Sequence, residues 1–350
     1  MRKIIHCDAD CFFVALEMRD DPSLCGIPVA VGGQPGKRGV ISTCNYEARA
    51  FGIHSAMASA HAKRLCPQLI ILPHNSQKYR EASEQMRAIF SSYSEQIEPL
   101  SLDEAFVDVS STHHCLGSAT LIAKEMRRRI KKQVGITVSA GVANNKFLAK
   151  VASDWQKPDG LTVIEPSRVK FFLKTLPVSC LPGVGKATAK KMTSLGIRTC
   201  SDLQALSEAS LIGHFGQYGV RLYHLSRGED DRPVSPRNYR QSLSVEHTVT
   251  QDLVELKQCY PLLAELDKKL DTRLHAMEKK QSITKQFIKV KYSDFQSSSI
   301  ETSSHRRSYG LYKQLLDDLW SKQQQPIRLL GVGVRFQSDL SEDQQQLSLL

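Results

Sequence analysis

The stretch HCDADCFFVALE, residues 6–17, decides the fold, because it runs from a buried strand through two acids into a helix. Residues 2–8, RKIIHCD, are typical of a short buried strand that ends in an acid. The following residues have the character of a short helix that Pro22 ends. Asp8 and Asp10 are two residues apart, so their side chains face the same way if the strand continues through them.

A second acidic pair lies in IEPLSLDEAFVDVS, residues 97–110, which we interpret as strand, turn and strand. Asp103 and Glu104 are adjacent, so they can serve one site only at a turn or a strand end. Carboxylates gathered there need cations, and two Mg²⁺ ions about 3.5–4 Å apart would suit in-line phosphoryl transfer. The alternative is that Asp8 or Asp103 simply caps a strand end. We interpret Asp108 as a solvated residue further along the strand.

The rest of the 350-residue chain predicts an α+β multidomain protein. Strands and helices alternate up to residue 165, a helical region follows, and the residues from 241 to 341 read strand, helix, strand, strand, helix, strand. No apolar run approaches membrane-spanning length. The nine cysteines form no C-x-x-C pair, so we expect reduced thiols of a cytoplasmic protein and no zinc site.

The net charge of +11 is concentrated in the second half of the chain. Residues 1–165 carry 20 basic and 17 acidic side chains, whereas residues 166–341 carry 27 and 17. This distribution favours a catalytic unit followed by units that bind a polyanion such as nucleic acid. Ordinary surface lysines and arginines are the alternative, and charge alone favours nucleic acid only modestly.

Four segments, in this order and at these separations, resemble the Y family of translesion DNA polymerases. They are HCDADCFFVALE (6–17), STCNYEARAFGI (42–53), IEPLSLDEAFVDV (97–109) and GVANNKFLAKVASDWQKPDG (141–160). The resemblance covers the whole chain and is densest in its first 165 residues. It implies a bacterial, DNA-associated enzyme that copies a DNA template by adding deoxynucleotides to a primer 3′ end. It also implies low-fidelity synthesis past damaged bases, without proofreading.

The same resemblance implies a right-hand polymerase fold with a clamp-binding tail. A ferredoxin-like palm would comprise residues 1–10 and 74–165, with small fingers at 11–73. A helical thumb would occupy 166–230, a linker 231–240 and a little-finger domain 241–341. The tail would be 342–350. The implied partners are primer–template DNA, deoxynucleoside triphosphates and the sliding clamp, and we expect a monomer without a membrane partner.

Carried over position by position, the resemblance implies a set of active-site residues. Asp8, Asp103 and Glu104 would be the catalytic acids and would hold two Mg²⁺ ions, with help from the backbone carbonyl of Ala9. The nucleotide-binding residues would be Phe12, Phe13, Thr43, Tyr46, Arg49 and Lys157. Among them, the Phe13 ring would be a steric gate, occupying the space that a ribose 2′-hydroxyl needs. Without the resemblance, the Phe pair would indicate core packing, and Tyr46 and Arg49 one face of a surface helix.

Three further segments suggest contacts with DNA and with the clamp. LPGVGKATAKK, residues 181–191, has the form of a helix-hairpin-helix, whose turn can approach a phosphate. The expected DNA-binding residues are Gly183, Val184, Gly185 and Lys186 there, and Lys285, Lys289 and Lys291 in KQFIKVKY. A solvated sheet face is the alternative for the last three. Gln346, Leu347, Leu349 and Leu350 resemble a clamp-binding peptide, and a final strand or a frayed end is the alternative.

Three rival functions remain to be weighed against a polymerase. A nucleotide cyclase would need no template, no helix-hairpin-helix and no basic second half. A DNA-binding or clamp-binding scaffold with an inactive palm would tolerate loss of Asp8, Asp103 or Glu104, yet all three are present. A metal-dependent nuclease would also use clustered acids but would leave the triphosphate-binding residues idle.

Overall fold

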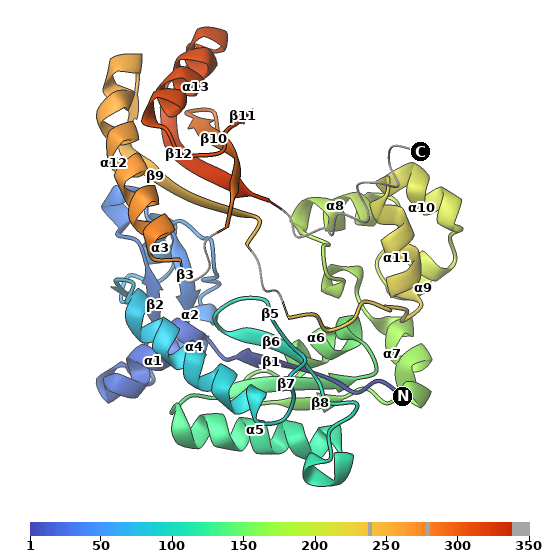
Figure 1. The fold of residues 1–350 in the computed structure, drawn as a ribbon. Coiled ribbons are helices and arrows are strands. Elements are labelled where there is room, and N and C mark those ends of the chain that lie inside the picture. The colour runs from blue at the N-terminus through green and yellow to red at the C-terminus, as the bar shows by residue number, and fades with distance from the viewer. Residues whose placement is uncertain (237–239, 278–280, 338–350) are drawn as a thin grey trace. The chain divides into compact units, whose positions relative to one another are not determined.

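The computed structural model describes residues 1–236, 240–277 and 281–337 of the chain. These residues form two compact units (Figure 1). The first comprises Met1–Gly33, Ile41–Met57 and His61–Pro236, and the second combines the C-terminal part of the chain with Gln34–Val40 and Ala58–Ala60. None of the described helices is long and apolar enough to cross a membrane.

A five-stranded sheet organises the first unit and has the order β5-β6-β1-β7-β8. Its central strand is β1 (Ile4–Ala9), which pairs antiparallel with β6 (Glu104–Asp108) and with β7 (Val138–Ala143). The edge strands are β5 (Ile97–Pro99) and β8 (Leu161–Val163). The turn between β5 and β6 confirms the expected strand, turn and strand, and the pairing sets Asp8 opposite Glu104.

Side chains alternate along β1, so its two faces meet different helices. Ile5 and Cys7 pack into a core with helices α4 (Ser76–Ser91) and α5 (Ala119–Gln133). On the opposite face, Ile4 packs into a second core with helix α6 (Lys146–Trp155). His6 and Asp8 share the face of Ile4 by this period of two. Helix α1 (Phe12–Asp20) follows the central strand directly.

A small subdomain inserted between α1 and α4 contains the three-stranded sheet β3-β2-β4. Its strands are β2 (Val29–Gly32), β3 (Ile41–Cys44) and β4 (Ile70–Leu72), and its helices are α2 (Tyr46–Arg49) and α3 (Ser59–Leu65). It has a separate buried core that includes Ile53 and Leu69.

Five helices follow the large sheet. They are α7 (Val169–Thr175), α8 (Lys186–Ser194), α9 (Cys200–Gln204), α10 (Glu208–Phe215) and α11 (Tyr218–Ser226). Their buried leucines belong to the same core cluster as α6. Beyond them, the chain up to Pro236 lies against the sheet. Lys146 Nζ donates to the carbonyl of Pro233, and the N–H of Ser235 donates to Glu98.

The second unit has the strand and helix order that the sequence predicts. Its elements are β9 (Ser242–Leu253), α12 (Leu256–His275), β10 (Ile283–Tyr292), β11 (Ser297–Ser303), α13 (Tyr309–Lys322) and β12 (Ile327–Phe336). The sheet order is β11-β10-β12-β9, with antiparallel neighbours throughout. Both helices bury leucines against one face of the sheet, including Leu266 and Leu316.

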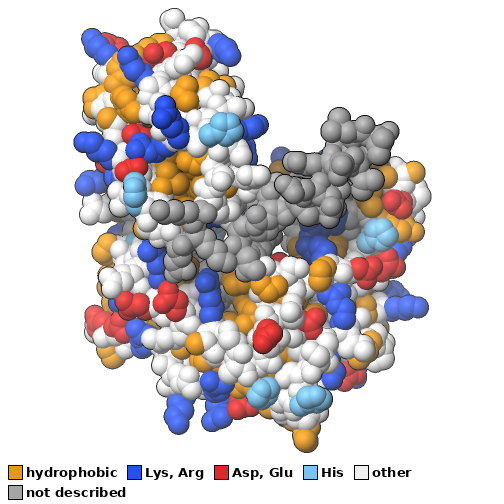
Figure 2. All heavy atoms as spheres, viewed as in Figure 1, with side chains coloured by type: hydrophobic (Ala, Val, Ile, Leu, Met, Phe, Trp, Pro, Cys, Tyr) orange, Lys and Arg blue, Asp and Glu red, His pale blue; other side chains and the backbone are white. Residues whose placement is uncertain are grey.

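The face of the molecule in Figure 2 shows how the charge is distributed. Lys and Arg side chains occur over the visible surface, with Asp and Glu side chains between them. Among the described residues that are visible on that face, the positive charge is therefore interspersed with negative charge.

Candidate active site

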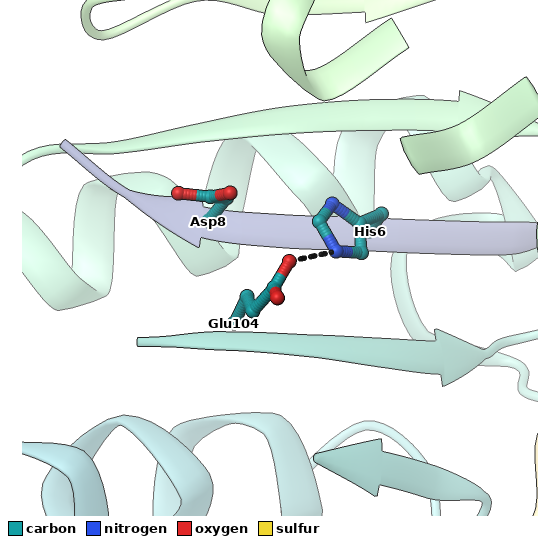
Figure 3. Close-up of side chains that lie close together, drawn as sticks. All are labelled: His6, Asp8 and Glu104. Carbon is teal, nitrogen blue, oxygen red and sulfur yellow. Dashed lines mark hydrogen bonds and ion pairs between the residues drawn. The ribbon is translucent and has the colours of Figure 1, made fainter. Parts of the chain in front are cut away.

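Two acids and a histidine meet where β1 and β6 run side by side (Figure 3). One ligand atom from each of His6, Asp8 and Glu104 lies within 4.8 Å of the others. The His6 ring bonds on both sides, with Nε2 3.0 Å from Glu104 Oε2 and Nδ1 2.7 Å from Ser153 Oγ. Sequence reasoning missed His6, although a residue two positions before Asp8 on a strand must share its face.

Asp103 lies in the turn just before β6 and lines the same cleft, but it is outside that close cluster. Its carboxylate accepts a hydrogen bond from Ser101 Oγ at 2.5 Å. The N–H of Ala9 donates to the Asp103 carbonyl at 3.0 Å, so the backbone after Asp8 is tied directly to this turn. Asp8, Ala9, Asp103 and Glu104 are therefore all at one end of the sheet.

Asp10 does not share the face of Asp8. That expectation required the strand to continue through Asp10, and it does not. Strand β1 ends at Ala9, and the Asp10 side chain turns into the protein, where it is 2% exposed. It accepts hydrogen bonds from Thr137 Oγ1 at 2.8 Å, Ser139 Oγ at 2.7 Å and the N–H of Asp159 at 2.8 Å.

Two lysines balance the charge of the acids. Lys157 Nζ is 2.6 Å from Asp8 Oδ1, and Lys150 bonds Glu104. Burial raises the pKa of Asp8 to about 6, against the opposing effect of Lys157. Burial would also raise the pKa of Glu104, but its hydrogen bonds to His6 and Lys150 outweigh this and lower that pKa to about 2. The site thus holds Glu104 ionised across the physiological range and Asp8 ionised above pH 6.

A cleft opens beside the acids, and sequence-predicted residues from several elements line it. The lining consists of Asp8, Ala9, Cys11, Phe12, Phe13, Ser42, Thr43, Tyr46, Arg49, Ser55, Asp103 and Lys157. Cys11, Ser42 and Ser55 were not predicted, and small polar residues in loops and strands give no signal from which they could have been. The structure therefore brings every predicted nucleotide-binding residue to one cavity.

Helix α2 presents two of these residues. Asn45 caps the helix by accepting from the N–H of Ala48. The Arg49 guanidinium lies over the Tyr46 ring, 4.6 Å from its centroid. The Tyr46 hydroxyl is buried and has no hydrogen-bond partner among the described residues, and burial raises its pKa to about 12. A buried hydroxyl that stays protonated and unpaired suits a polar ligand.

Two phenylalanines give the lining of the cleft an aromatic part. Phe13 stacks on Tyr79 of α4, with ring centroids 4.3 Å apart and an interplanar angle of 17°. Phe12 is only 2% exposed, and its ring lies 5.6 Å from Phe13. The Tyr79 hydroxyl donates to Glu17 at 2.7 Å, and this hydrogen bond fixes the Tyr79 ring. Tyr79 was not predicted, because no local pattern links it to residues that precede it by more than sixty positions.

The expected DNA-contacting residues lie in two places. Gly183 has φ +97°, and a Cβ there would meet the Tyr218 hydroxyl at 2.7 Å, so this turn requires glycine. Val184 follows it, Gly185 caps α8, and Lys186 is its first residue. In the second unit, Lys285, Lys289 and Lys291 share the exposed face of β10.

Two of the three β10 lysines already have acidic partners. Lys285 pairs with Glu301 at 2.6 Å and Lys289 with Glu246 at 2.9 Å. A phosphate would therefore compete with a carboxylate for each of these lysines. Gln346, Leu347, Leu349 and Leu350 of the expected clamp-binding peptide lie outside the described residues.

Comparison with protein families matches three parts of the chain. Residues 7–154 match the impB/mucB/samB family, and residues 240–349 match the C-terminal domain of that family. Residues 179–230 match the thumb domain of DNA polymerase-iota.

Individual relatives match over nearly the whole length. The chain is 53% identical to DNA polymerase IV of Pseudomonas syringae pv. tomato, covering 99% of this chain and 98% of the relative. It is 52% identical to DNA polymerase IV of Ectopseudomonas mendocina, covering 99% of each. Among solved structures, a chimera of the Y-family DNA polymerases Dbh and Dpo4 superposes with a TM-score of 0.87 at 26% identity, covering 95% of this chain and 98% of the chimera. An insertion ternary complex of Dbh DNA polymerase has a TM-score of 0.68 at 26% identity and the same coverage.

Proposed function

This chain belongs to the Y family of DNA polymerases and is a DNA-directed DNA polymerase, and we propose that the cleft beside Asp8 is where it adds deoxynucleotides to a primer. The observation that carries the proposal is the convergence of Asp8, Asp103 and the predicted triphosphate-binding residues on this one cavity. The reaction is low-fidelity translesion synthesis without proofreading.

The acidic end of the cleft fits divalent metal ions. Asp8, Asp103, Glu104 and the carbonyl of Ala9 would supply oxygen ligands, which suit two Mg²⁺ ions. Bound Mg²⁺ would favour ionisation of the primer 3′-hydroxyl and neutralise charge on the triphosphate. The present partners of the carboxylates support this assignment, because Lys150 and Lys157 place positive charge beside both partly buried acids.

The basic end of the cleft fits the triphosphate. Arg49 and Lys157 supply cations, and the unpaired Tyr46 hydroxyl supplies a neutral donor. Thr43 on β3 adds a hydroxyl to the same wall. Lys157 would exchange its bond with Asp8 for bonds to phosphate once cations take over the charge of that acid, so nucleotide and metal binding would support each other.

The aromatic wall fits the sugar. Phe13 stacks on Tyr79 and lines the cavity. A ribose 2′-hydroxyl would therefore collide with a ring that has little room to move. Phe12 packs beside it. The site should therefore prefer deoxynucleotides.

The remaining parts of the chain would hold primer–template DNA. Residues 1–10 and 74–165 would be the palm, 11–73 the fingers and 166–230 the thumb, whose Gly183–Lys186 turn would approach a phosphate through its N–H groups. After the linker at 231–240, the lysines on β10 of the little finger, 241–341, would add contacts to the backbone. The tail, 342–350, would bind the sliding clamp and raise processivity by tethering a monomer to DNA.

Primer extension tests the proposal directly. The wild type should extend a primer with four deoxynucleotides and Mg²⁺, on an intact template and on one with a minor-groove guanine adduct. Asp103→Ala should lose about a thousandfold in rate, because metal-ion stabilisation of the transition state is worth several kcal/mol and each 1.4 kcal/mol is tenfold. Asp108→Asn, at the far end of β6, is the matched control and should extend normally.

Each alternative predicts a different result. If the wild type and Asp103→Ala both bind DNA and neither extends the primer, the chain is a scaffold and the metal assignment is wrong. Shortening of the DNA would indicate a nuclease. Consumption of nucleotide without any template would indicate a cyclase-like enzyme.

A further inference from the structure

His74 lies just before helix α4 and contacts residues that line the cleft. Asn75 is the N-cap of α4, and its side chain accepts from the N–H of Lys78. His74 is thus the residue before the cap, and Tyr79 is the fourth residue of the helix. Side chains at these two positions commonly pack together and fix the angle at which the chain enters a helix. Here the two rings meet edge to face, with centroids 6.3 Å apart and planes at 72°.

From this position, the imidazole reaches two residues of the cleft. Its ring packs edge-on against Phe13, with centroids 5.6 Å apart and planes at 75°. Its Nε2 is hydrogen-bonded to Ser42 Oγ at 2.6 Å. Ser42 belongs to β3 and Phe13 to α1, and both line the cleft. The His74 side chain therefore contacts residues of three elements, α1, β3 and α4.

We propose that His74 is a positioning residue for sugar selection, which holds the Phe13 ring and the Ser42 hydroxyl together as one rigid wall of the nucleotide cleft. This inference rests on the proposed function, in which Phe13 excludes the ribose 2′-hydroxyl.

The argument depends on how firmly the gate ring is held. A ring excludes a hydroxyl only to the extent that moving the ring costs more than the binding gained. Tyr79 blocks retreat across one face of Phe13, because it is itself buried at 1% exposure and tied to Glu17. That stack does not stop the ring from sliding within its own plane. His74 meets Phe13 nearly at right angles and so opposes the sliding motion, and its bond to Ser42 keeps the imidazole in place.

Variants separate the ring contact from the hydrogen bond. His74→Ala removes both, whereas His74→Phe keeps an aromatic ring and removes the bond to Ser42. Ser42→Ala removes the same bond from the other side, so it should add nothing to His74→Phe. The measured quantity is the ratio of kcat/KM for a deoxynucleotide to kcat/KM for the matching ribonucleotide in single-nucleotide primer extension. General damage to the fold lowers both values together and leaves this ratio unchanged.

We expect the ratio to fall about tenfold in His74→Ala, because an aromatic contact and a hydrogen bond are both lost. It should fall about threefold in His74→Phe, in Ser42→Ala and in the double variant. Phe13→Ala should give a larger loss than any of these. His61→Ala, which removes an exposed histidine of α3 that bonds Arg64, is the matched control and should leave the ratio at the wild-type value.

The outcomes distinguish this inference from the function on which it rests. A wild-type ratio in His74→Ala, together with a lost ratio in Phe13→Ala, would overturn the role of His74 and leave the gate in place. An unchanged ratio in Phe13→Ala would overturn the gate itself. A double variant much worse than His74→Phe would show that Ser42 acts independently of the imidazole.

Discussion

Replacement of Asp10 is the sharpest test of how this active site is built. The carboxylate does not line the cleft, yet it accepts three hydrogen bonds, from Thr137 just before β7, from Ser139 in β7 and from the N–H of Asp159 just before β8. One donor, the N–H of Asp159, comes two residues after Lys157. Asp10 also precedes Cys11, which has φ 43° and begins the helix that carries Phe13. The variants to compare are Asp10→Ala and Asp10→Asn.

The structure sets the expected magnitudes. Asp10→Ala leaves three donors without their acceptor, and a buried unsatisfied donor costs about 1–3 kcal/mol. The hydroxyls of Thr137 and Ser139 can rotate towards other partners, whereas the N–H of Asp159 cannot, so we expect a loss of about 3 kcal/mol. In Asp10→Asn, the amide oxygen can accept from Thr137 and Asp159, and the amide N–H can donate to Ser139. The expected loss is then about 1 kcal/mol, from the missing charge.

The functional effect should follow the position of Lys157. When the Asp159 anchor is lost, the segment that carries Lys157 gains freedom, and KM for the deoxynucleotide should rise about tenfold in Asp10→Ala, equivalent to about 1.4 kcal/mol of binding. The value of kcat should change much less. Asp10→Asn should keep a KM close to that of the wild type.

Two measurements check this reasoning. Urea unfolding can be followed through Trp155 in a Trp320→Phe background, because these are the two tryptophans of the chain and they lie in different units. Steady-state primer extension gives KM and kcat. If Asp10→Asn is as damaging as Asp10→Ala and lowers kcat, then the charge itself acts in the reaction, as expected of a metal ligand, and the positioning role is wrong.

Three further predictions concern charge and backbone strain. Lys146→Met should cost about 3–5 kcal/mol in urea unfolding, because Lys146 and Glu98 form a buried pair at 2.5 Å, and adding Glu98→Gln should restore most of that loss. Since Asp8 has a pKa of about 6 and must lose its proton to bind metal, Mg²⁺ affinity measured by calorimetry should fall about tenfold per unit below pH 6 and level off above pH 7. The folding stability of the metal-free protein should change with pH in the opposite direction. Because the pKa of Asp8 is raised in the fold, protonation of Asp8 adds stability as the pH falls from 7 to 4. Gly183→Ala should lower thermal stability by about 2 kcal/mol, because φ is +97° there, whereas a Cβ at Gly185 meets open space and should have little effect.

The sequence predicts those parts of the fold in which apolar residues follow a recognisable strand or helix pattern. The short buried strand near the start of the chain and the order of strands and helices from residue 241 to 341 were both predicted, and the structure confirms them as β1 and as β9 to β12 with their two helices. Helices α2 and α3 show the limit of this reasoning. The segments around them have helical composition, but α2 ends at Arg49, and Gly52 then takes φ +78°. A single residue in that conformation ends a helix that propensity alone would extend.

The candidate site could be predicted only where a residue's role depends on its neighbours in the chain. The spacing of Asp8 and Asp10 correctly raises the question of whether they share a face, but the answer lies in Thr137 and Ser139, more than a hundred positions away. The same is true of Tyr79, which stacks on Phe13 although the inserted subdomain separates the two residues in the chain.

The lysine partners of the acids explain how such a site can fold before any metal arrives. Two partly buried carboxylates, Asp8 and Glu104, stand opposite each other on neighbouring strands, and each would oppose folding if its charge were left alone. Lys150 and Lys157 offset those charges from the same side of the sheet, and His6 adds a hydrogen bond without requiring a charge. Because Lys157 also borders the cleft, under the proposed function this cation would become available to the triphosphate once metal ions took its place beside Asp8. Lys157 would therefore serve twice, first by offsetting the charge of Asp8 in the empty site and then by binding the substrate.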